Sequence, residues 1–223
     1  MGQAIGESLP FAIGVAISPI PIIAVVLMLL SKRAGANSTA FALGWLVGIA
    51  GVTAVVLVVA GSIGTTSDGS QSNGTSTVKL VLGILLLFLG VRNWRKRPAR
   101  GGTAALPKWL QAIENITPGK SVALGVGLSA INPKNLIMIV GGGVAISQAP
   151  TSPGGHIGAA VIFVALAATT VVVPVVLYRI MGARAQPMLE SLDAWLEQNS
   201  ATVMSVLLLV IGVVLVGKGI GGF

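Results

Sequence analysis

The chain has 223 residues, of which 54% are hydrophobic and only 9% are charged, and it contains no cysteine. Soluble domains carry about a quarter charged residues, so the composition indicates a protein embedded in lipid, without room for a soluble catalytic domain. The lack of cysteine excludes disulfides and thiolate chemistry, and the net charge of +8 must be explained by membrane topology before nucleic acid is considered.

Long apolar runs predict six transmembrane helices. A bilayer core needs roughly 20 apolar residues per helix, and such runs occur at Ser8–Leu30, Thr39–Ser62, Val78–Asn93, Ser121–Ile146, Ile157–Met181 and Ala201–Gly217. We therefore expect an all-α membrane protein with a single transmembrane domain. A GxxxG motif in the second run and a proline in the fifth predict positions of helix packing or gating, at Gly44, Trp45, Gly48 and Pro174.

Lysine and arginine gather in alternate loops. Lys32 and Arg33 follow the first run and Arg184 follows the fifth. The loop 94–117 is the most basic, and we expect its cations and those at its edge to contact anionic lipid: Arg92, Arg95, Lys96, Arg97 and Arg100. Under the positive-inside rule these loops are cytoplasmic, which predicts a bacterial inner-membrane protein with both termini outside the cytoplasm.

The two halves of the chain share a motif near the middle of their first spans. Ser18-Pro19-Ile20-Pro21 in the first run corresponds to Asn132-Pro133-Lys134-Asn135 in the fourth. Each half holds three spans, so the second half would be inserted upside down relative to the first. We therefore predict two inverted three-helix repeats, about 1–93 and 118–223, with spans one and four broken at the prolines.

The broken helices are the predicted substrate site. Ser18 and Asn132 each precede a proline and are expected to cap a new half-helix inside the bilayer, where its unpaired N–H groups would favour an anion. Pro21 removes a further donor, so the Asn132 side should bind an anion better. Lys134 is the one ionisable residue expected deep in a span. The predicted substrate-binding residues are Ser18, Pro19, Pro21, Asn132, Pro133, Lys134 and Asn135.

Several chemistries lack the residues they need. No carboxylate is expected in a span core, which disfavours carboxylate-based proton antiport, whereas a Na⁺ site made of backbone carbonyls stays open. His156, the only histidine, falls in a predicted loop. No set of acid, base, nucleophile or metal ligands faces the membrane interior, so we expect no enzyme activity, metal or cofactor.

At the two proline motifs the sequence resembles the lysine-exporter (LysE) superfamily, and within it the actinobacterial GAP family of peptidoglycolipid and sulfolipid addressing proteins. The resemblance also covers the segment 40–48, Ala-Phe-Ala-Leu-Gly-Trp-Leu-Val-Gly. It implies a small inner-membrane exporter or export factor, acting on glycolipids in this branch. Amino-acid exporters carry an Asn-Pro-Gly-Pro-like segment where this chain has Ser18-Pro19-Ile20-Pro21, which disfavours a small amino-acid substrate.

Three hypotheses follow. The first is an exporter or export facilitator for an amphipathic, anionic lipid or glycolipid. The second is an exporter of small polar solutes such as amino acids. The third is a scaffold that transports nothing and recruits glycolipid-synthesis or lipid-export machinery through its basic loop. Membrane lipids are the expected partners in each case, and homo-oligomer formation stays open.

Overall fold

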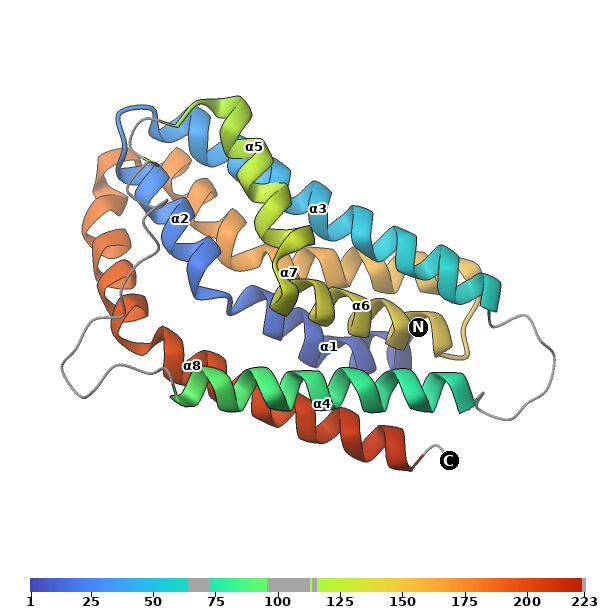
Figure 1. The fold of residues 1–223 in the computed structure, drawn as a ribbon. Coiled ribbons are helices and arrows are strands. Elements are labelled where there is room, and N and C mark those ends of the chain that lie inside the picture. Colours follow the sequence, from blue (N-terminus) through green and yellow to red (C-terminus); the bar gives the residue numbers. More distant parts are fainter. Residues whose placement is uncertain (64–72, 96–112, 114–115, 222–223) are drawn as a thin grey trace.

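The computed structural model describes residues 1–63, 73–95, 113 and 116–221, and all regular structure within these ranges is helical (Figure 1). Its elements are α1 (Gly2–Ala16), α2 (Pro19–Leu30), α3 (Ala34–Ile63), α4 (Asn73–Arg95), α5 (Pro118–Val126), the π-helical turn η2 (Gly127–Ile131), α6 (Pro133–Gln148), α7 (Pro153–Met181), the 3₁₀ turn η3 (Gly182–Ala185) and α8 (Gln186–Ile220).

Three segments are long and apolar enough to cross a membrane unaided: Ala34–Ala60, Pro153–Met181 and Ala201–Ile220. Two bent pairs qualify if each is one span, α1 with α2 at 51° and α5–η2 with α6 at 64°. The described residues thus contain three to five candidate spans. The prediction that spans one and four are broken helices agrees with these bends, because both lie at the predicted prolines.

The third predicted span, and with it the six-span inverted repeat, stays a prediction. The third predicted span, Val78–Asn93, lies within α4, which is not among the candidate spans. α8 begins well before the sixth predicted span and continues through it as one helix. His156 lies in the first turn of α7 rather than in a loop, because Ser152 caps that helix and accepts a hydrogen bond from the Gly155 N–H at 3.2 Å.

The bundle has two chemically different ends (Figure 1). Both termini lie at one end, beside the end of α3 and the start of α4; we call this the terminal end. The end of α4, the start of α5 and the end of α7 lie at the other, the basic end. The described cations of the basic end are Lys32, Arg33, Arg92, Arg95, Lys120, Arg179 and Arg184. The described residues that flank the three predicted cytoplasmic loops thus lie at one end of the molecule.

Glycines set the closest helix contacts. A Cβ at Gly44 would lie 2.2 Å from the Val122 carbonyl oxygen, and one at Gly125 would lie 2.4 Å from the Phe41 carbonyl oxygen, so α3 and α5 touch backbone to backbone. α4 and α8 pair in the same way, since a Cβ at Gly219 would lie 2.9 Å from the Leu80 nitrogen. The Gly44 motif therefore packs two helices of the same chain.

Candidate functional site at the helix breaks

The first break ends α1 because Pro19 has no N–H to continue the helix. The last helical bond runs from the Ile17 N–H to the Ile13 carbonyl, at 2.9 Å. The carbonyls of the final turn, among them those of Gly14 and Ala16, then lack the N–H four residues ahead that a continuing helix would supply. Such groups are costly inside a bilayer and need other donors.

The second break begins with a widened turn and ends in a capped helix. The Asn132 N–H bonds to the Gly127 carbonyl five residues back, at 3.2 Å. The Asn132 side chain then accepts a hydrogen bond from the Lys134 N–H at 3.1 Å, so the predicted cap of α6 is confirmed. Asn135 is buried and donates from Nδ2 to the Leu128 carbonyl at 2.9 Å, which supplies a donor that Pro133 lacks.

Ser18 occupies the equivalent position at the start of α2 but does not cap it. Its side chain makes no capping hydrogen bond, although the residue is only 2% exposed. A cap hydroxyl accepts from the second or third N–H of the helix. Pro21, the third residue, has no N–H, and the N–H of Ile20, the second, makes no bond to the Ser18 hydroxyl. The prediction of a side-chain cap at Ser18 is therefore wrong, while Pro19 and Pro21 are buried in the bundle as parts of the break.

Lys134 joins the two breaks. Its side chain is 9% exposed, and Nζ donates to the carbonyl oxygen of Gly14 in the last turn of α1. A cation is favoured at a helix C-terminus, where unpaired carbonyls carry partial negative charge. The proline motifs predict two half-helix N-termini at this place. The first turn of α6 instead lies against the C-terminal end of α1, because the two helices pack together in an antiparallel arrangement (Figure 1).

A third helix completes the junction. The Thr170 hydroxyl of α7 donates to the Ala16 carbonyl, and Pro174 lies one turn further along the same helix. α7 remains a single helix through Pro174, which is buried. Gly14 and Thr170 are not among the site residues predicted from the sequence. We define the helix-break junction as Gly14, Ala16, Asn132, Lys134, Asn135 and Thr170.

The packing residues lie beside this junction. Trp45 is fully buried and stacks on Phe41, with ring centroids 6.4 Å apart. Its Nε1, like Oδ1 of Asn135, has no hydrogen-bond partner among the described residues. A Cβ at Gly48 would lie 1.9 Å from Oγ of Ser129, which places this glycine against η2. The second break is therefore held directly against α3.

The predicted lipid-contact residues are described only in part. Arg92 and Arg95 are exposed in the last turn of α4, at the basic end. Lys96, Arg97 and Arg100 lie outside the described residues. The searched residues contain no group of three or more histidine, aspartate or glutamate side chains that could hold a metal ion.

The family of this chain is shown by a family model that covers most of its length. The family model of Sap, the sulfolipid-1-addressing protein, matches residues 9–221, which is nearly the whole chain. The chain belongs to the Sap family. Neither the curated proteins nor the solved structures contain a match. The family assignment supports the sulfolipid-addressing part of the resemblance drawn from the sequence, and membership of the wider LysE superfamily stays a prediction.

Proposed function

We propose that this protein is an inner-membrane export facilitator for an anionic amphipathic lipid or glycolipid, whose headgroup passes the helix-break junction. The family is named for the addressing of a sulfolipid. The observation that carries the site assignment is the buried ammonium of Lys134 at the meeting point of the two breaks. A lone charge buried in a membrane protein is expensive and is typically retained for function.

Lys134 has capacity to bind an anion. An ammonium carries three N–H donors, and one of them is used by the Gly14 carbonyl, the only partner of Nζ among the described residues. Two donors are left for the oxygens of a sulfate or phosphate headgroup. Asn132 holds the backbone of the same turn in a helical N-terminus, whose dipole also favours negative charge.

Passage of a headgroup requires a second conformation. α1 and α6 are packed together, with Phe11 lying where a Cβ at Gly141 would fall. If the halves are inverted repeats, the equivalent of this pair is α2 with α5, and those two helices do not form a packed pair. An export cycle would exchange these arrangements, opening the α1–α6 seam while α2 approaches α5.

Lipid movement in reconstituted vesicles tests the site. Wild type should speed the transfer of a fluorescent sulfated or phosphorylated lipid between leaflets, measured by the accessibility of its headgroup to an added quencher. Lys134→Met keeps the aliphatic stem and should lose most of this activity, while Lys134→Arg should keep more. The matched control is Lys120→Met, which removes an exposed lysine at the basic end.

The outcomes separate the hypotheses. If wild type moves the lipid no faster than protein-free vesicles do, the scaffold hypothesis replaces export. If Lys134→Met equals wild type, the site assignment is wrong. Transport of amino acids but not of lipids by the same vesicles would favour the small-solute hypothesis.

The seam can be tested separately, because the chain has no cysteine of its own. Cysteines introduced at Phe11 and Gly141 can be joined by a short, reducible cross-linker. The cross-link should stop lipid movement, and a reductant should restore it. Undiminished movement in the cross-linked protein would show that α1 and α6 need not separate.

A further inference from the structure

A shallow hollow at the terminal end lies away from the helix-break junction. It opens where the α4–α8 pair meets α1 and α6. Its apolar floor includes Phe11, Leu82 and Leu215, and its charged residues are Glu7, Lys79 and Lys218. Apart from α8, α6 is the main packing neighbour of α4. The hollow therefore lies between the α4–α8 pair and the rest of the bundle.

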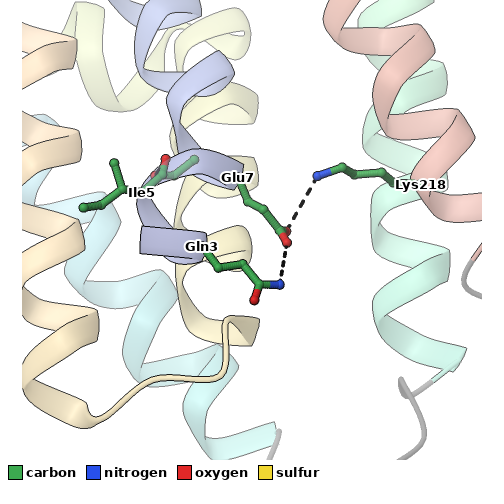
Figure 2. A network of polar contacts seen from close by, with 5 residues as sticks. Gln3, Ile5, Glu7 and Lys218 are labelled. Atoms are coloured by element: carbon green, nitrogen blue, oxygen red, sulfur yellow. Dashed lines mark hydrogen bonds and ion pairs between the residues drawn. The ribbon is translucent and has the colours of Figure 1, made fainter. Parts of the chain in front are cut away.

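The charges of the side chains that line this hollow do not cancel. Lys218 lies 3.7 Å from Oε2 of Glu7, and Gln3 donates from Nε2 to Oε1 of the same carboxylate at 3.0 Å (Figure 2). Figure 2 shows Lys218 reaching across from α8 to α1. Lys79 has no charged or hydrogen-bonding partner among the described residues. Two lysines and one carboxylate therefore line this hollow, and within the described part of the chain only Lys218 is paired, which leaves a net charge of +1.

The ion pair is weak enough for a ligand to compete with it. The Lys218 and Glu7 side chains are 46% and 30% exposed, and the separation of 3.7 Å is near the limit for a salt bridge. Exposed pairs of this kind contribute little stability. An incoming anion could therefore bind Lys79 and Lys218 together without breaking a strong interaction.

The arrangement of an apolar floor beneath two accessible lysines matches an anionic amphiphile. Lysines close to helix ends extend toward the headgroup region, while apolar side chains below them remain at acyl-chain depth. We propose that this hollow binds an anionic membrane lipid, with its headgroup on Lys79 and Lys218 and part of its acyl chain on Phe11, Leu82 and Leu215. The site is distinct from the helix-break junction and does not depend on transport.

Site-specific quenching tests this proposal. Val81 is exposed on α4 between Lys79 and Leu82, and Val91 is exposed on the same helix near Arg92. A single cysteine at either position can carry a fluorophore in an otherwise cysteine-free chain. In vesicles that contain a small fraction of lipid with brominated acyl chains, brominated phosphatidylglycerol should quench the label at Val81 more strongly than brominated phosphatidylcholine does.

Substitutions of the lysines and of Glu7 should change the preference for the anionic lipid in opposite directions. Lys79→Gln and Lys218→Gln should each weaken the apparent affinity for phosphatidylglycerol about fivefold. Glu7→Gln should strengthen it, because it frees Lys218 and removes a negative charge. The label at Val91 should not respond to these substitutions, which shows that each variant is folded and that the effect is local.

Two results would overturn the proposal. Equal quenching at Val81 by the two brominated lipids would show that the hollow has no preference for an anion. An unchanged preference in the Lys79→Gln, Lys218→Gln double variant would show that these lysines do not hold the headgroup. Neither result bears on lipid transfer through the junction, which is measured by a different assay.

Discussion

Replacing Gly48 with alanine probes the contact between α3 and the second helix break. The new Cβ would lie 1.9 Å from Oγ of Ser129, far inside the ordinary contact distance. Ser129 cannot turn away freely, because its hydroxyl donates to the carbonyls of Gly125 at 2.9 Å and Val126 at 3.0 Å. Relief of the clash therefore costs either those hydrogen bonds or a displacement of η2 from α3.

The expected change in the free energy of unfolding combines two unfavourable contributions and one favourable contribution. Overpacking a close contact costs about 1–3 kcal/mol, and loss of the Ser129 hydrogen bonds adds about 1 kcal/mol. Alanine in place of glycine regains about 1 kcal/mol in a helix. We expect Gly48→Ala to lower the free energy of unfolding by about 2 kcal/mol. Gly51→Ala is the matched control, since a Cβ there would meet nothing within 4 Å.

A second substitution separates side-chain from backbone clashes. Ser129→Ala removes Oγ and should restore most of the stability of Gly48→Ala, because the next contact is the Ser129 Cβ at 3.1 Å. It should not rescue Gly44→Ala, whose Cβ would strike the Val122 backbone carbonyl. Stability can be measured by circular dichroism as a denaturing detergent is added to mixed micelles. Failure of the rescue, or an equal loss in Gly51→Ala, would refute this account of the packing.

The same assay tests the polar contacts at the breaks. Asn132→Ala should lower the free energy of unfolding by about 1 kcal/mol, as loss of a helix cap does, whereas Ser18→Ala should cost clearly less because its hydroxyl caps nothing. Thr170→Val should cost about 1–2 kcal/mol by leaving the Ala16 carbonyl unpaired. Thr169→Val should have little effect, since that exposed hydroxyl bonds only within α7. Equal losses within either pair would contradict the assigned hydrogen bonds.

The positions of the breaks could be predicted because proline acts locally. Pro19 and Pro133 each remove a helical donor, and the helices bend at both positions. The cap at Asn132 followed from the same local chemistry. Ser18 differs, because Pro21 removes one of the two possible donors and the remaining one, the Ile20 N–H, is not bonded to the Ser18 hydroxyl.

The partners of the freed carbonyls could not be predicted in the same way. The hydrogen bond between Lys134 and Gly14 joins residues 120 positions apart, and that between Thr170 and Ala16 joins residues 154 apart. Gly14 and Ala16 take part through backbone oxygens, which every residue has. Their roles depend on how α1, α6 and α7 pack, and no local pattern in a single sequence encodes that packing.

Under the proposed function, these contacts would couple ligand binding to opening of the seam. In the described conformation Lys134 donates a hydrogen bond to the Gly14 carbonyl and so links α6 to the end of α1. An anionic headgroup that attracts the ammonium would weaken this hydrogen bond and leave the Gly14 carbonyl without a donor. The free-energy cost of the unpaired Gly14 carbonyl applies to the closed conformation alone, because opening the α1–α6 seam lets water reach this carbonyl. A ligand that binds the open state more tightly shifts the population toward it. The same lysine could therefore close the empty junction and favour its opening when an anion arrives.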